Sequence, residues 1–71
     1  MKLPLVSGRE VVKALGRVGY YCERQRGSHI RLYHAERTSM TVPNHFEVDR
    51  TTLRKILLTA GISADEFVEL V

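Results

Sequence analysis

The chain is short of cysteine and of long apolar runs, and each shortage excludes a class of protein. Among the 71 residues there is one cysteine, Cys22, so no disulfide can form within the chain, which fits a reducing cytoplasm. Cys22 has no cysteine or histidine neighbour at a metal-binding spacing, which argues against a zinc site. The apolar run in residues 1–8 is too short for a signal peptide, and no later stretch could cross a bilayer. We therefore expect a cytoplasmic protein with no metal, no other cofactor and no membrane segment.

Two arrangements that support common enzyme mechanisms are also missing. Gly27 is a single glycine in a predicted turn, not a glycine-rich loop that could cradle phosphates. Ser28 and His29 are neighbours in a predicted strand, where side chains alternate between faces, so we expect no nucleophile–base pair. Repeats, linkers and low-complexity segments are absent as well, and the length predicts one small domain over residues 1–71.

The charges are unevenly distributed along the chain. Eleven lysines and arginines against eight acidic residues give a net charge of +3. Several arginines gather in the middle of the chain, at Arg24, Arg26, Arg31 and Arg37, while acidic residues concentrate in residues 65–69. A basic centre favours an anionic ligand such as nucleic acid. An ordinary solvated strand face explains the same charges equally well, so charge alone does not choose between the two.

Three helices are predicted, over residues 7–18, 49–60 and 63–71. Each combines a capping residue with apolar residues at three- and four-residue steps. Ser7 opens the first helix with a capping box, and Gly19 is expected to end it. Asp49 or Thr51 caps the second, which stops at Gly61, and a second capping box opens the third.

Three strands are predicted between the first two helices, over residues 20–25, 28–34 and 38–42. The short connection around Gly27 predicts an antiparallel hairpin. Alternation along the second strand directs Ile30 and Leu32 to the core. The opposite face then carries His29, Arg31 and Tyr33. The element order predicts an α+β fold of the form α-β-β-β-α with a short extra helix, in which helices cover one face of a three-stranded antiparallel sheet.

The outward histidine suggests proton transfer beside a phosphate. Histidine titrates near neutral pH, and the planar fork of an arginine can donate to two phosphate oxygens. His29 with Arg24, Arg26 or Arg31 could therefore supply a base and electrostatic stabilisation for metal-independent RNA cleavage. A strand histidine that binds phosphate without doing chemistry fits the pattern as well.

The other two histidines, His34 and His45, are not expected to be catalytic. His34 shares the parity of the buried positions of its strand, which predicts a structural histidine at the end of the sheet. His45 follows a proline and an asparagine in a loop, where a structural or partner-contacting role is expected.

Several short blocks occur in an order that is specific when they are taken together. They are residues 19–20 (Gly-Tyr), 24–29 (Arg-Gln-Arg-Gly-Ser-His), 42–45 (Val-Pro-Asn-His), 52–57 (Thr-Leu-Arg-Lys-Ile-Leu) and 60–63 (Ala-Gly-Ile-Ser). The chain in this respect resembles the HicA, or YcfA-like, family of toxins. It departs from many relatives at Thr51, where they have glycine, and at Leu58, where they have a basic or polar residue.

The resemblance implies a fold like that of double-stranded-RNA-binding domains, and a toxin that acts as a ribosome-independent mRNA interferase. The histidine of its Gly-Ser-His motif, here His29, is implied to be catalytic, and a HicB-like antitoxin is implied to bind the toxin and block cleavage. The residues expected to contact RNA are Arg24, Arg26, Ser28, Arg31, Arg54 and Lys55.

Two other functions remain open from the sequence. A non-catalytic module of the same fold would read double-stranded RNA through 2′-hydroxyl and phosphate contacts, with basic residues such as Arg50 at the start of its second long helix. A protein-interaction domain would instead use the free face of the sheet to dock a partner.

Overall fold

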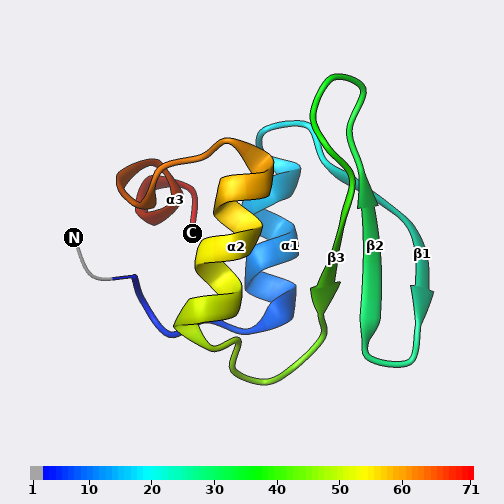
Figure 1. Cartoon of the computed structure of the whole chain (residues 1–71). Helices are drawn as coiled ribbons and strands as arrows, with labels where there is room; N and C mark the ends of the chain where they lie inside the picture. The colour runs from blue at the N-terminus through cyan, green and yellow to red at the C-terminus, as the bar shows by residue number, and fades with distance from the viewer. Residues whose placement is uncertain (1–2) are drawn as a thin grey trace.

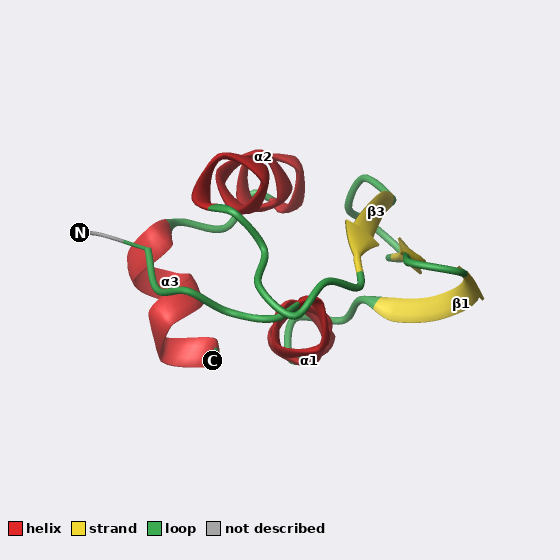
Figure 2. Ribbon diagram, turned by 90° about the horizontal axis from the view of Figure 1, so that it is seen from below, coloured by secondary structure: helices red, strands yellow, loops and turns green. Residues whose placement is uncertain are grey.

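The computed structural model describes residues 3–71 and has the predicted order of elements (Figure 1). A three-stranded antiparallel sheet forms one side of the molecule, and its helices lie together on the other side, as the view along them shows (Figure 2). The α+β fold, with the α-β-β-β-α order and the short extra helix, is confirmed. Residues 1 and 2, which the single-domain prediction includes, lie outside the described residues. None of the helices in residues 3–71 has the length and hydrophobicity needed to span a membrane.

Helix α1 spans Gly8–Gly16 and begins at the predicted capping box. The Ser7 hydroxyl accepts from the Glu10 amide at 3.1 Å, and the Ser7 amide donates to the Glu10 carboxylate at 2.9 Å. The prediction that α1 runs to Val18 and ends at Gly19 is wrong. The helix stops at Gly16, and a turn with Gly19 at φ 105° carries the chain to the sheet.

The sheet consists of β1 (Tyr21–Arg26), β2 (His29–Tyr33) and β3 (Met40–Pro43), in the order β1-β2-β3. The predicted hairpin is confirmed, but its turn is one residue further along than expected. Arg26 pairs with His29, so the turn consists of the two residues between them. Gly27 lies there at φ 58°, which is costly for a residue with a side chain, and a glycine at the first central position is typical of type II′ hairpin turns. Strand β2 therefore begins at His29 and not at Ser28, and the predicted starts of β1 and β3 shift to Tyr21 and Met40.

The alternation predicted for β2 is confirmed. Ile30 and Leu32 are buried on the helix side of the sheet, together with the β3 residues Met40 and Val42. Their neighbours His29, Arg31 and Tyr33 are exposed or half-buried, which fits the opposite face. The helices thus cover one face of β2 and β3 and leave the other face open to solvent, while every residue of β1 is exposed.

The C-terminal helices complete the core. Helix α2 (Arg50–Ala60) is capped by Asp49 and not by Thr51, and Gly61 ends it in the left-handed region at φ 73°. Its apolar stripe is buried throughout, at Leu53, Ile56, Leu57 and Ala60. Helix α3 (Ala64–Leu70) buries Phe67, but Val71 is half exposed and lies outside the core, because the helix ends just before it.

The predicted structural role of His34 is confirmed. Its Nε2 lies 2.7 Å from the Val18 carbonyl oxygen, while its Nδ1 accepts from the amides of Glu36 at 2.9 Å and Arg37 at 3.0 Å. Two amide donors at Nδ1 assign the ring proton to Nε2, which donates to Val18. The imidazole thereby joins the turn after α1 to the loop after β2.

Replacing His34 should therefore weaken the fold itself. His34→Ala leaves one carbonyl and two amides without their partner, which should lower the free energy of unfolding by about 1–3 kcal/mol. Urea denaturation measures this, with His45→Ala as the matched control, because the His45 side chain is exposed and its loss should cost less than about 0.5 kcal/mol. Equal effects of the two changes would contradict the bridging role.

The cap of α2 predicts a dependence of stability on pH. Hydrogen bonds from the Thr52 amide and, secondarily, the Thr52 hydroxyl hold the pKa of the Asp49 carboxyl below its ordinary value. Because folding lowers this pKa, the carboxylate stabilises the fold above about pH 4, and the contribution is lost as the pH falls through the folded pKa. Asp49→Asn keeps a capping side chain without a charge, so its stability should fall less steeply with acid. Urea midpoints between about pH 5 and about pH 2.5 test this, and parallel curves for the two chains would contradict it.

Candidate functional site

The open face of the sheet owes its composition to a bulge in β1. Tyr21 pairs with Tyr33 and Cys22 with Leu32, but Arg24 pairs with Arg31, so Glu23 is an extra residue on β1. Regular alternation from Cys22, the partner of a buried leucine, would have directed Arg24 to the helix side. The extra residue reverses the alternation, as bulges do, and gives Arg24 the face of its partner Arg31.

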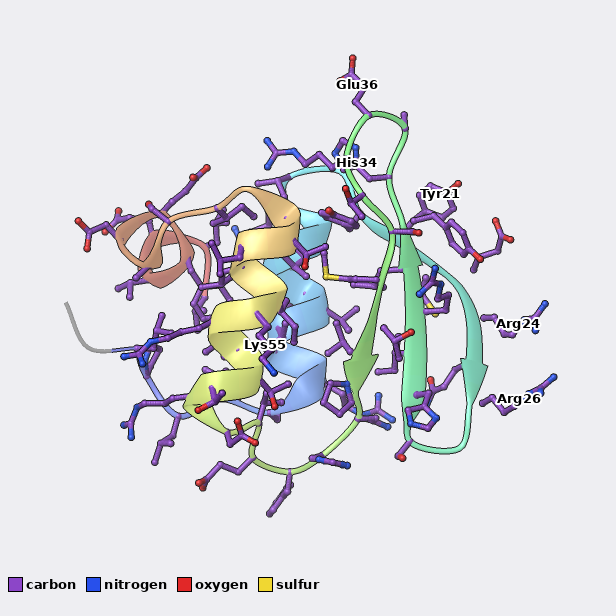
Figure 3. All side chains as sticks on the ribbon, in the orientation of Figure 1. Tyr21, Arg24, Arg26, His34, Glu36 and Lys55 are labelled. Atoms are coloured by element: carbon purple, nitrogen blue, oxygen red, sulfur yellow. The ribbon has the colours of Figure 1, made fainter. Side chains whose placement is uncertain are left out.

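A shallow basic hollow of about 260 Å³ results on this face. It is lined by Arg24, Arg26, His29, Arg31 and Tyr33. Figure 3 shows Arg24 and Arg26 extending outward from β1, at the edge of the molecule farthest from α2. Three guanidinium groups and no carboxylate line this hollow, so its charge favours an anion.

Among the arginines that line the hollow, Arg31 is held in place by hydrogen bonds to other side chains. Its guanidinium donates to the hydroxyls of Thr41 at 3.1 Å and Ser39 at 3.0 Å. Its Cζ also lies 5.5 Å from the centre of the Tyr33 ring, within the range of a cation–π contact. Sequence reasoning missed Ser39 and Thr41. Thr41 pairs with Arg31 across β2 and β3, so a predicted register for these two strands could have identified Thr41.

His29 lies at the end of β2 next to the turn, between Arg26 on one side and Pro43 on the other. Its side chain is exposed and lines the hollow, as predicted. An accessible imidazole beside guanidinium groups can take a proton from a hydroxyl next to a bound phosphodiester, while the cations stabilise added negative charge.

The remaining predicted contacts are divided between two places. Ser28 is in the turn beside the hollow, where its carbonyl accepts from the Asn44 amide at 2.7 Å. The prediction that Ser28 lies in the strand, from which we excluded a pair with His29, is therefore wrong. Arg54 and Lys55 lie exposed on α2 and do not line the hollow. Figure 3 shows Lys55 separated from Arg24 and Arg26 by the sheet strands.

The fold and this face together define a small α+β domain with a histidine in a cationic hollow on an open sheet. A family model described as "HicA toxin of bacterial toxin-antitoxin" matches residues 8–62, which is most of the chain. The protein therefore belongs to the HicA toxin family, as its sequence blocks indicated, and is a toxin of a toxin–antitoxin system with an antitoxin as partner. No significant match was found among curated proteins or among solved structures.

The two faces of β2 should respond differently to truncation. Arg31→Ala removes an outward side chain and its hydrogen bonds, which should lower the free energy of unfolding by about 1 kcal/mol. Leu32→Ala, one residue along, removes a side chain with no exposed surface and should cost about 2–5 kcal/mol. Urea denaturation of both variants makes the comparison. A larger loss for Arg31→Ala would show that the orientation of β2 is incorrectly assigned.

Proposed function

We propose that the protein is an mRNA interferase, a metal-independent endoribonuclease that arrests growth by cleaving mRNA. The observation that carries the proposal is the convergence of His29 and three arginines in one open hollow. The family supports it, because a toxin needs an activity that harms its host unless an antitoxin restrains it.

The groups that line the hollow suit cleavage of RNA by its own 2′-hydroxyl. His29 takes the proton of a ribose 2′-hydroxyl, and the 2′-oxygen attacks the adjacent phosphorus. The bond from phosphorus to the 5′-oxygen breaks, which yields a 2′,3′-cyclic phosphate on one fragment and a 5′-hydroxyl on the other. The leaving oxygen takes its proton from water, which reaches the exposed hollow freely.

The arginines stabilise the charge that builds up on the phosphate. Arg31 is positioned in advance by Ser39 and Thr41, so it loses little freedom when it binds an oxygen. Arg24 and Arg26 are exposed and can close on the phosphate from the β1 side. In-line attack by a 2′-hydroxyl is hindered in a regular A-form helix, so the substrate is single-stranded or distorted RNA.

The antitoxin has a direct way to act on such a site. A HicB-like antitoxin that covers the hollow would exclude RNA and pair its own acidic groups with the arginines. Because the hollow is shallow and lies on an open sheet face, a folded partner can reach it.

Cleavage of RNA in the presence of a chelator tests the proposal. The wild-type chain should cleave, and His29→Ala should be slower by about 100- to 10,000-fold, the usual contribution of proton transfer by a side chain. Arg17→Ala is the matched control, because it removes an exposed charge from the turn after α1, away from the residues that line the hollow. The measurement is the initial rate at a fixed concentration of labelled RNA, with the fragment ends identified by mass.

The other outcomes assign the alternatives. RNA that binds to both chains without being cleaved would make the protein a non-catalytic RNA-binding module. A chain that neither binds nor cleaves RNA would be a protein-interaction domain. Equal cleavage by wild type and His29→Ala would show that the nuclease activity does not depend on this histidine.

A further inference from the structure

A second depression lies at the turn end of the sheet. It has a volume of about 300 Å³ and is lined by Ser7, Arg9, Asn44, His45 and Phe46. It is connected to the segment that carries His29, because the Asn44 amide donates to the carbonyl of Ser28, the residue that precedes His29. Asn44 is thus a neighbour of the turn that precedes His29, which brings this depression within the length of a short RNA bound at His29.

Phe46 is the unusual residue in the lining. Its side chain is 100% exposed, so it contributes nothing to the core. The loop that carries Phe46 is nevertheless held by backbone hydrogen bonds both before and after this residue. The His45 carbonyl accepts from the Gly8 amide at 2.9 Å, and buried Val48 donates to the Val6 carbonyl at 2.7 Å. The fold therefore presents an aromatic ring to solvent from an anchored segment.

The opposite wall of the depression is the start of α1, which is pressed directly against the loop. A Cβ atom on Gly8 would overlap the Pro43 carbonyl oxygen and approach the Asn44 Cα to 2.9 Å, so only glycine permits this contact. The contact places the next residue, Arg9, beside the loop that carries Phe46.

The lining suits a nucleotide better than an apolar protein side chain. An aromatic face can stack on any base, and such stacking is the usual source of affinity for single-stranded nucleic acid. The amide of Asn44 and the imidazole of His45 can hydrogen-bond the edge of a base, and Arg9 supplies a cation for a phosphate.

From this geometry we infer that the depression binds the base of a nucleotide that flanks the scissile phosphate, stacked on Phe46 with Arg9 near its phosphate. The inference rests on the proposed RNA cleavage and adds a positioning residue to it. Phe46 holds the RNA in register over His29 and does not touch the reacting atoms.

An abasic scan tests the inference. The probe is a fluorescein-labelled octauridine RNA in which one abasic residue is moved along the chain, and affinity is measured by anisotropy in a His29→Ala background, where the RNA survives. One abasic position should weaken binding about tenfold, within the range known for loss of base stacking. Adding Phe46→Ala should weaken binding of the intact RNA by a similar factor and abolish the effect of the abasic residue. Phe46→Trp should instead keep both the affinity for intact RNA and the effect of the abasic residue.

Leu58→Ala in the same background is the matched control. Leu58 is 81% exposed on α2, so the change also removes an exposed apolar side chain but lies outside both depressions. It should leave the affinity and the abasic scan unchanged. Thermal melts should show that neither Phe46→Ala nor Leu58→Ala unfolds the chain, because both side chains are exposed.

Several results would overturn the inference. If Phe46→Ala weakens intact and abasic RNA equally, or behaves like the Leu58→Ala control, Phe46 stacks on no base. If RNA binding is unchanged but the antitoxin binds more weakly to Phe46→Ala, the depression belongs to the protein partner. In each case continued cleavage by the unsubstituted chain keeps the proposed function intact. If that chain neither binds nor cleaves RNA, the proposed function fails together with the inference.

Discussion

The register between β1 and β2 is the constraint on which the rest of the site depends. The additional residue at Glu23 places Arg24 and Arg26 on the same face of the sheet as their β2 partners Arg31 and His29. Without a reversal of the alternation, Arg24 would follow Cys22 to the side of the helices and point away from Arg31 and His29. The bulge thus joins three arginines and one histidine into a single surface, and it also twists the exposed edge of the sheet.

Strand β2 contributes to the core with one face and to the site with the other. The helices cover Ile30 and Leu32, while His29 and Arg31 project from the other side of β2. No polar or charged residue in the described part of the chain is buried, so the cations of the site remain hydrated until a ligand displaces the water. Their position therefore carries little cost in desolvation, and a chain of this size can keep a strongly charged face without loss of its small core.

A backbone hydrogen bond between Asn44 and Ser28 links the segments that line the two depressions. The first offers charge for a phosphate and an imidazole for its chemistry, and the second offers an aromatic ring for a base. In the proposed cleavage reaction, contacts on both sides of the scissile bond would reduce the freedom that the RNA must lose in the reacting geometry.

The sequence by itself determined the elements, their order, the cap at Ser7 and the face of β2, because capping and alternation depend on near neighbours. It left Asp49 and Thr51 as alternatives for the cap of α2, and the structure selects Asp49. The sequence also indicated the family and singled out His29. Only the tertiary structure decided where α1 ends, since the bond from His34 to Val18 connects segments that no local pattern relates. The faces of Arg24 and Arg26 were likewise decided by pairing, because a bulge is visible only when the partner strand is in place. The basic hollow and the exposed ring beside it are likewise properties of the folded chain, since each brings together residues from separate segments.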